Sequence, residues 1–180
     1  MLLDRRRSLL LVIDFQANLA PAIHEGAAAV AKARRLLEIA RLLDVPRLAS
    51  EQYPRGLGPT LPELAALLEP GETVEKLAFS AAREPAFLEA LAARRRPQLV
   101  VTGMEAHVCV LQTALVLKEL GYAVFLVADA VGSRRPEDRA LALQRLQAAG
   151  VTLVSAEMVA FEWLGRAGTA EFREALPLIK

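Results

Sequence analysis

Residues 98–121 read QLVVTGMEAHVCVLQTALVLKELG, and this stretch contains the pattern that repeats along the chain. The run at 98–103 is apolar and rich in branched residues, which is typical of a buried strand. A short turn, MEAHV, follows, and the segment 109–120 then has the composition of an apolar helix that ends before Gly121. A buried strand that leads through a turn into a helix is typical of α/β proteins.

Short apolar runs with the character of strands recur at five other places, namely 8–14, 46–51, 73–76, 122–128 and 151–155. They are apolar nearly throughout, as expected for strands covered on both faces. Helix-length segments separate them, which favours parallel pairing through crossover helices. The sequence therefore predicts an α/β fold: a three-layer α/β/α sandwich around a six-stranded, parallel, Rossmann-like sheet.

The predicted helices have a helical spacing of apolar residues or proline in the first turn. Apolar residues recur with helical spacing between Leu36 and Leu43, and Pro85 and Pro136 suit the first turns of helices at 85–95 and 136–148. The segment 51–62, EQYPRGLGPTLP, is expected to be a loop because it is rich in Gly and Pro. The tail should form two short helices broken between Gly165 and Gly168, with Thr169 as the N-cap of the second.

Composition limits the classes of function. The 180 residues are 54% hydrophobic, which suits one domain over 1–180. The 22 basic and 21 acidic residues nearly cancel, so we expect a small-molecule substrate and no nucleic-acid partner. The apolar runs are far shorter than the roughly 20 residues of a bilayer span, so no membrane partner is expected. Cys109, the single cysteine, cannot form an internal disulfide, which favours a cytoplasmic location.

Three reactive side chains follow three of the predicted strands. Asp14 ends the first strand, Lys76 ends the third, and Cys109 lies just beyond the fourth. Ligands of open parallel sheets bind outside the carboxyl ends of the strands, where the strand order reverses. If the first and fourth strands are neighbours, these side chains converge on one crevice.

Each of these residues also has a plain structural interpretation. Cys109 at the start of a helix, near Lys76, should favour the thiolate, but free cysteines are also common small core residues. Asp14 suits a helix cap, and Lys76 suits a solvated strand end. None of the three is specific without the other two.

Taken together, the motifs LLLVIDFQ, EKLAFSA and VVTGMEAHVCVLQTALVLKELGY resemble those of the isochorismatase-like cysteine hydrolases. The similarity runs from about residue 8 to the C-terminus, and it extends to a small branch that shares GMEAHVCVLQTA, the EQYPRGLG loop and the WLGRAGTAEF tail. The resemblance implies a catalytic triad of Asp14, Lys76 and Cys109. It also implies a cis peptide between Glu105 and Ala106, and an oxyanion site built from the N–H groups of Ala106 and Cys109.

The chain departs from better-known members of that superfamily. Nicotinamidases place histidines for a metal in the loop after the second strand, and the segment 51–63 has none. We therefore expect no metal and no cofactor. The reaction that names the superfamily needs no cysteine nucleophile, so Cys109 points to amide chemistry instead. Phe15, Gln52, Tyr53 and Phe79 are expected to line the substrate pocket, although the aromatic residues could equally be core.

Three hypotheses follow from the sequence. The first is a cysteine hydrolase that cleaves a small amide or related acyl compound through a thioester on Cys109. The second is a redox or thiol-stress protein in which Cys109 is oxidised without turnover. The third is a catalytically inactive assembly protein of the same fold. The resemblance and the apolar tail favour a homo-oligomer, a dimer or higher, and His107 is interpreted as a hydrogen-bonding residue of the turn.

Overall fold

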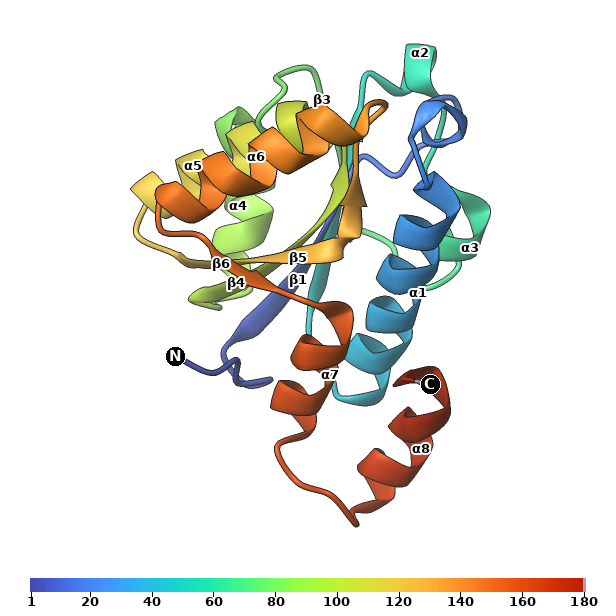
Figure 1. Ribbon diagram of the computed structural model, residues 1–180, viewed down its shortest axis with the longest axis vertical. Helices are drawn as coiled ribbons and strands as arrows, with labels where there is room; N and C mark the ends of the chain where they lie inside the picture. The colour runs from blue at the N-terminus through green and yellow to red at the C-terminus, as the bar shows by residue number, and fades with distance from the viewer. Residues whose placement is uncertain (180) are drawn as a thin grey trace.

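The computed structural model describes residues 1–179 and shows a parallel sheet between two layers of helices (Figure 1). All neighbouring strands pair in parallel, and the strand order is β3-β2-β1-β4-β5-β6. The strands are β1 (Ser8–Ile13), β2 (Arg47–Gln52), β3 (Thr73–Lys76), β4 (Gln98–Met104), β5 (Ala123–Gly132) and β6 (Thr152–Val154). The predicted three-layer α/β fold with six parallel strands is confirmed.

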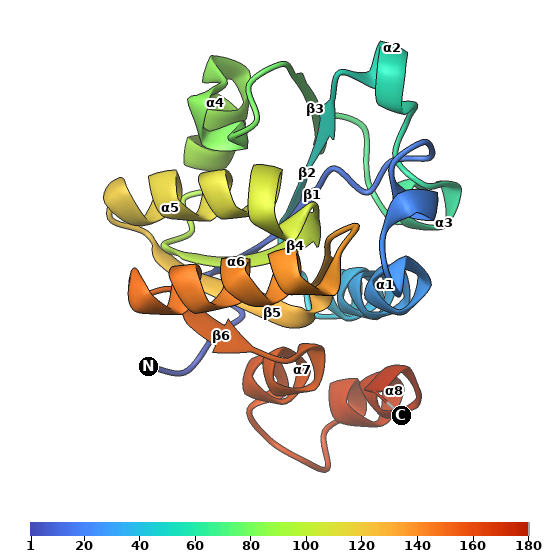
Figure 2. The same ribbon diagram turned by 45° about the horizontal axis from the view of Figure 1, so that its top comes forward.

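The helices divide between the two faces of the sheet, as Figure 2 shows. One face is covered by α1 (Gly26–Leu42) and α7 (Ala156–Leu164), with α8 (Ala170–Ile179) packed beside them. The opposite face is covered by α4 (Pro85–Ala93), α5 (Leu111–Glu119) and α6 (Pro136–Ala148). Shorter helical turns are found at Ala20–Ala22, Pro54–Leu57 (α2), Pro62–Ala65 (α3), Ala81–Arg83 and Ala106–Val110. Within the described residues, no helix is both long and apolar enough to cross a membrane.

Alternating residues of the central strand β1 supply the two halves of the core. Leu10 and Val12 pack in the cluster beneath α1, whereas Leu9, Leu11 and Ile13 pack in the cluster beneath α5. Successive side chains of a strand point to opposite faces, so a strand buried on both faces must be apolar at every position. This requirement explains the uninterrupted apolar run that the sequence shows at 9–13.

Two segments differ most from their predicted boundaries. Strand β5 continues to Gly132 rather than ending at 128, because Asp129 has partners that allow a carboxylate within a strand. Its Oδ1 accepts a hydrogen bond from the backbone N–H of Ala156 at 2.8 Å, and its Oδ2 lies 3.4 Å from Lys32 Nζ. The predicted loop at 51–62 begins with the last two residues of β2 and contains the single helical turn α2.

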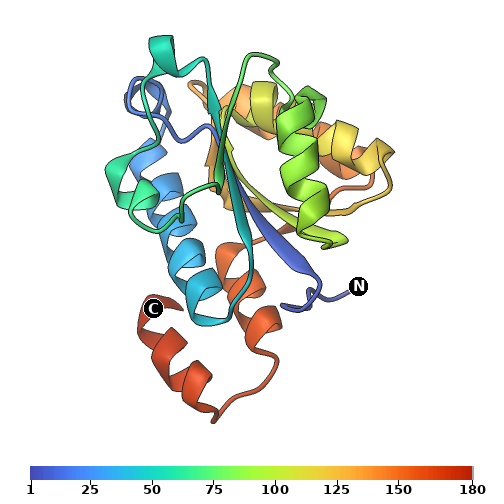
Figure 3. The same ribbon diagram turned by 180° about the vertical axis from the view of Figure 1, so that it is seen from behind.

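The tail follows the predicted pattern of two short helices. Helix α7 ends before Gly165, which has a φ of 63°, and α8 begins at Ala170. The side-chain oxygen of Thr169 accepts a hydrogen bond from the backbone N–H of Phe172 at 3.0 Å, which confirms the N-cap. Figure 3 shows the resulting helix α8 at the base of the molecule, beside α1 and α7.

The strand order reverses at β1. The chain moves outward from β1 to β2 and β3, and then returns to place β4 on the other side of β1. Gly103 of β4 allows this close junction: its φ is 152°, and a Cβ atom there would lie 2.5 Å from the carbonyl oxygen of Ile13. The carboxyl ends of β1 and β4 therefore flank a switch point of the kind that binds ligands in open parallel sheets.

Candidate active site

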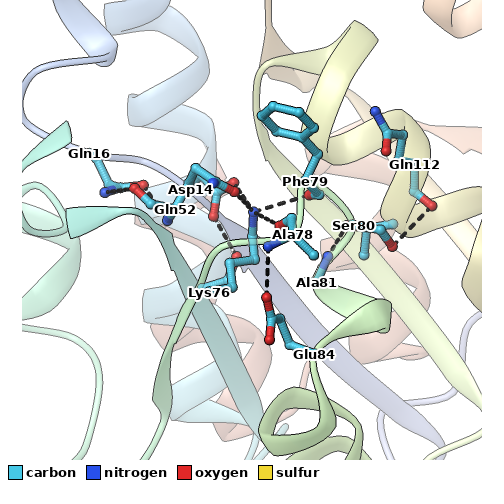
Figure 4. Close-up of polar contacts among 12 residues, drawn as sticks. Asp14, Gln16, Gln52, Lys76, Ala78, Phe79, Ser80, Ala81, Glu84 and Gln112 are labelled. Carbon is cyan, nitrogen blue, oxygen red and sulfur yellow. Dashed lines mark hydrogen bonds and ion pairs between the residues drawn. The ribbon is translucent and has the colours of Figure 1, made fainter. Parts of the chain in front are cut away.

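Asp14 directly follows β1 and has an unusual backbone conformation, which a hydrogen bond to the neighbouring strand β2 holds in place. Its φ of 53° lies in the left-handed region, and its backbone N–H donates to Ser50 O at 3.1 Å. The carboxylate is fully buried. Its Oδ1 accepts a hydrogen bond from Ser50 Oγ at 2.6 Å, and its Oδ2 lies 2.8 Å from Lys76 Nζ (Figure 4).

Lys76 ends the edge strand β3, and its ammonium group is surrounded by oxygen atoms. Besides Asp14 Oδ2, Nζ contacts Gln52 Oε1 at 2.6 Å and the carbonyl oxygens of Ala78 and Phe79 at 3.2 and 3.1 Å. Both members of the Asp14–Lys76 ion pair have no exposed side-chain surface. A lysine ammonium has only three protons to donate, so this one has no free donor for a ligand.

Cys109 lies in the widened, π-helical turn Ala106–Val110 that joins β4 to α5. In this turn Val110 N–H reaches back five residues to Glu105 O at 3.2 Å, and turns of this kind are frequent at functional sites. The thiol is 6% exposed and packs among the core residues beneath α5. Asp14 and Lys76 both influence the ionisation of this thiol, and their joint role with Cys109 in one reactive site stays a prediction.

The resting protonation state of Cys109 differs from the predicted thiolate. Burial, reinforced by the negative charge of Asp14, raises the pKa of the Cys109 thiol to about 12, and Lys76 only partly opposes this. Burial also raises the pKa of Asp14, while Lys76 and Ser50 act in the opposite direction. The resting group is therefore a thiol beside a carboxylate of increased basicity, which is the pairing that proton transfer requires.

The cis peptide lies one bond earlier than predicted. It joins Met104 to Glu105, and the predicted Glu105–Ala106 bond is not cis. Strand β4 still pairs with β5 at Met104, so the chain must turn immediately afterwards. The next peptide instead leads into the helical turn, where Glu105 O accepts from the N–H groups of Val108 and Val110 at 3.1 and 3.2 Å.

The four predicted pocket residues fall into two groups. Phe15 is fully buried in the core beneath α1, where it packs the fold and offers no surface to a ligand. Gln52 is 8% exposed and binds Lys76. Tyr53 and Phe79 are 52% and 55% exposed, and Tyr53 lines a surface pocket of about 560 Å³ together with Lys76. A groove of about 910 Å³ between α1 and α8 contains none of the three reactive residues.

Sequence reasoning missed two residues of the site, Ser50 and Gln16. Ser50 binds the Asp14 carboxylate, and Gln16 Oε1 accepts from the backbone N–H of Gln52 at 2.7 Å. A signal was present: Ser50 and Gln52 are two residues apart in a strand, so they share one face near its carboxyl end. The candidate site thus draws on four adjacent strands, β3, β2, β1 and β4.

The turn that carries Cys109 is anchored to the loop after β5. His107 Nδ1 lies 2.9 Å from Ser133 Oγ, which agrees with its interpretation as a hydrogen-bonding turn residue. The Glu105 carboxylate accepts from Arg134 Nε at 3.0 Å. Within residues 1–179, no group of three or more His, Cys, Asp or Glu side chains is arranged to hold a metal ion.

The fold and this cluster define a class: a parallel α/β protein with a buried Asp-Lys-Cys set at the switch point of its sheet. The isochorismatase domain pattern matches residues 8–158. The chain belongs to the isochorismatase family, as its motifs indicated, and this membership indicates a hydrolase type of function.

Similar proteins extend over nearly the whole chain. An isochorismatase domain-containing protein 2 of Danio rerio is 38% identical over 177 residues, which cover 98% of this chain and 89% of that protein. The structure described as MAR1 ribonuclease from Caenorhabditis elegans is 34% identical with a TM-score of 0.93, covering 99% of this chain and 92% of that one. The Escherichia coli YcaC structure, described as an octameric hydrolase of unknown specificity, is 26% identical with a TM-score of 0.93, covering 99% and 90%.

Proposed function

We propose that this chain is a cysteine hydrolase that cleaves a small amide or related acyl compound through a thioester on Cys109. One observation carries the proposal: the thiol lies beside a buried Asp14–Lys76 ion pair at the switch point of the sheet. A buried charge pair in contact with a nucleophile is costly to maintain and is typical of functional sites. Membership of a hydrolase family supports the same reaction class.

The proposed reaction uses Asp14 as the proton shuttle. As Cys109 Sγ attacks the carbonyl carbon, the thiol proton moves to the Asp14 carboxylate, and the carbonyl π electrons move to oxygen. When the tetrahedral intermediate collapses, the C–N bond breaks and the departing amine takes the proton from Asp14. Water then attacks the thioester while Asp14 removes its proton; the C–S bond breaks, Cys109 Sγ takes that proton back from Asp14, and a carboxylic acid is released.

Backbone donors are proposed to stabilise the oxyanion. Ala106 and Cys109 lie in the first turn of a helical segment, where N–H groups lack the acceptors of a continuous helix. Each such donor is worth roughly 3 kcal/mol in acyl transfer. The cis bond at Met104–Glu105 precedes this turn. The proposed oxyanion donors are the N–H groups of Ala106 and Cys109 within the turn.

Tyr53 and Phe79 are proposed as apolar walls of the substrate site because both rings are exposed close to Lys76. In Figure 4 the Phe79 ring points away from the ion pair, although its carbonyl oxygen contacts Lys76. With Leu77, 72% exposed, these side chains form an apolar patch at the edge strand β3. We propose that a second copy of the chain covers this patch, as the octameric E. coli relative suggests.

The redox hypothesis is weaker on physical grounds. Oxidation to sulfenic acid proceeds through the thiolate and follows its exposure, whereas burial raises the pKa of Cys109 to about 12.

A cytoplasmic location is part of the proposal, since a single cysteine suits a reducing compartment.

The decisive experiment is intact-mass analysis of the protein after incubation with a panel of small amides and esters. We expect an acyl adduct on the wild-type chain, free amine or alcohol in solution, and neither with Cys109→Ala. RNA serves as a counter-substrate because of the name of the C. elegans structure. RNA cleavage that survives Cys109→Ala, without any acyl adduct, would overturn the proposal, and inertness towards the whole panel would favour the inactive assembly protein.

A further inference from the structure

Both polar atoms of the Gln52 amide are hydrogen-bonded inside the protein. Its Oε1 accepts from Lys76 Nζ at 2.6 Å and its Nε2 donates to Leu77 O at 2.9 Å. Because the Nε2 bond fixes which way the amide faces, its oxygen must point at the ammonium group. The side chain is therefore a built acceptor for Lys76, and both of its polar atoms already have partners within the protein.

Gln16 holds the backbone of Gln52 in turn. Its Oε1 accepts from Gln52 N–H at 2.7 Å, and its Nε2 donates to Gln52 O at 3.0 Å and to Gly58 O at 2.7 Å. Gln16 is fully buried. The two glutamines thus connect Lys76 to the loop that follows α2, as Figure 4 shows for the pair itself.

Lys76 needs such an acceptor because of its place in the fold. It ends β3, an edge strand with a neighbour on one side only, and its long stem is flexible. The buried ammonium group is compensated only if oxygen atoms replace its lost water. Gln52 supplies the shortest of its contacts, at 2.6 Å, compared with 2.8 Å for the contact to Asp14.

We infer that Gln52 is a positioning residue that holds the Lys76 ammonium against Asp14 and so sets the proton-transfer properties of the Cys109 thiol. This role rests on the proposed hydrolase function for its use in turnover, but it acts on the resting protein. Lys76 lowers the pKa of both Asp14 and Cys109. Once Gln52 no longer fixes it, less thiolate forms at any given pH.

The test measures the rate at which iodoacetamide alkylates Cys109 between pH 7 and 9.5. We expect Gln52→Leu to slow alkylation about tenfold and to move the whole rate–pH curve to higher pH, since a hydrogen bond to a charged group is lost. Gln98→Leu is the matched control, because Gln98 is also a buried glutamine, and its side chain binds Asp4 N and Leu2 O at the other end of the sheet. It should leave the curve in place.

A double-mutant cycle separates positioning from a general disturbance of the site. In a Lys76→Met background, Gln52→Leu should slow alkylation no further, because the residue through which Gln52 acts is gone. An equal tenfold loss in that background, or no loss in the wild type, would overturn the role. If Gln52→Leu does not fold, Gln52→Asn keeps the amide but shortens it, and alkylation should fall by a smaller factor with the same dependence on Lys76.

Amide turnover distinguishes this role from the proposed function. If turnover is found, Gln52→Leu should lower kcat with KM nearly unchanged, whereas a substrate-binding glutamine would raise KM. If the alkylation pattern is found but no amide is cleaved, the positioning role of Gln52 stands and the proposed hydrolase function fails. If the chain cleaves amides but Gln52→Leu is alkylated at the wild-type rate, the hydrolase function stands and the positioning role fails.

Discussion

Two buried polar clusters lie at opposite ends of the same sheet, and they differ in one respect. The amino-end cluster consists of Ser8, Gln98 and Trp163, joined by Trp163 Nε1 donating to Ser8 Oγ at 2.9 Å and Ser8 Oγ donating to Gln98 Oε1 at 3.3 Å. All of its groups are neutral. The carboxyl-end cluster contains the ionisable residues Asp14, Lys76 and Cys109 together with Ser50, Gln16 and Gln52.

Burial and hydrogen bonding are therefore common to both ends. What distinguishes the carboxyl end is charge held out of water beside a nucleophile, which costs stability unless every partner is present. The amino-end cluster can be explained by the need to satisfy buried donors and acceptors. The two clusters thus differ in buried charge, and variants at each end of the sheet can test the effect of that difference.

The largest expected effect is on turnover. Asp14→Asn removes the proton acceptor while keeping the side-chain shape, so turnover of the amide identified in the adduct experiment should fall at least about a thousandfold. Gln98→Leu at the amino end should change it less than about twofold. Steady-state kinetics on both variants makes the measurement, and full activity of the Asp14→Asn variant would remove Asp14 from the mechanism.

Stability should also respond unequally at the two ends. Lys76→Met leaves the buried Asp14 carboxylate unpaired and is expected to lower the free energy of unfolding by about 3–5 kcal/mol at pH 8. Gln98→Leu should cost about 1–2 kcal/mol. Urea unfolding of both variants at pH 8 gives these values.

The pH dependence of the Lys76→Met loss follows from the raised pKa of Asp14. A group whose pKa is higher in the folded than in the unfolded state stabilises the fold at low pH, and this contribution is lost as pH rises. Without Lys76 the pKa of Asp14 rises further, so the variant should regain stability relative to the wild type when the pH falls from 8 to 5. A loss that is the same at both pH values would show that the ion pair is not the cause.

A smaller effect is expected from the thiol alone. The pKa of Cys109 is about 12, against an ordinary value of 9.0, so its contribution to stability is complete below pH 9 and declines as pH rises towards 12. Between pH 8 and 11 the wild type should lose about 2–3 kcal/mol more than Cys109→Ala. Urea unfolding of both chains across this range tests the difference, and parallel curves would mean that the folded thiol ionises normally.

The smallest expected effect is at the amino end. Trp163→Phe removes the hydrogen bond to Ser8 Oγ and should lower the free energy of unfolding by about 1–2 kcal/mol. Iodoacetamide should alkylate Cys109 of this variant at the wild-type rate under native conditions. A slowed reaction would mean that the two clusters are coupled through the sheet.

Much of the fold was predictable because its strands are buried on both faces. The central residues of these strands, 9–13 and 99–101, had to be apolar, and that requirement is visible in the sequence. The extension of β5 was not visible, since Asp129 looks like the end of a strand until its partners Ala156 and Lys32 are known. Such compensation depends on residues that are distant in the chain.

In the candidate site, the placement of Asp14, Lys76 and Cys109 at one end of the sheet was predictable, the contacts that support them were not, and their reactivity stays a prediction. Asp14, Lys76 and Cys109 each follow a strand, so topology alone brings them together. The roles of Gln52 and Phe15 depend on side-chain direction: one turns to Lys76, and the other packs beneath α1. The raised pKa of Cys109 likewise comes from its burial, which the sequence position at a helix start did not indicate.

The reactive residues come from β1, β3 and the turn after β4, so the site exists only when four adjacent strands have assembled. In an unfolded chain the lone thiol would be exposed and would ionise near its ordinary pKa of 9.0, and it would be modified faster. Cys109 is thus a natural reporter of chain opening. In urea, the labelling of Cys109 in excess of its native rate measures how often this half of the sheet comes apart, without any engineered probe.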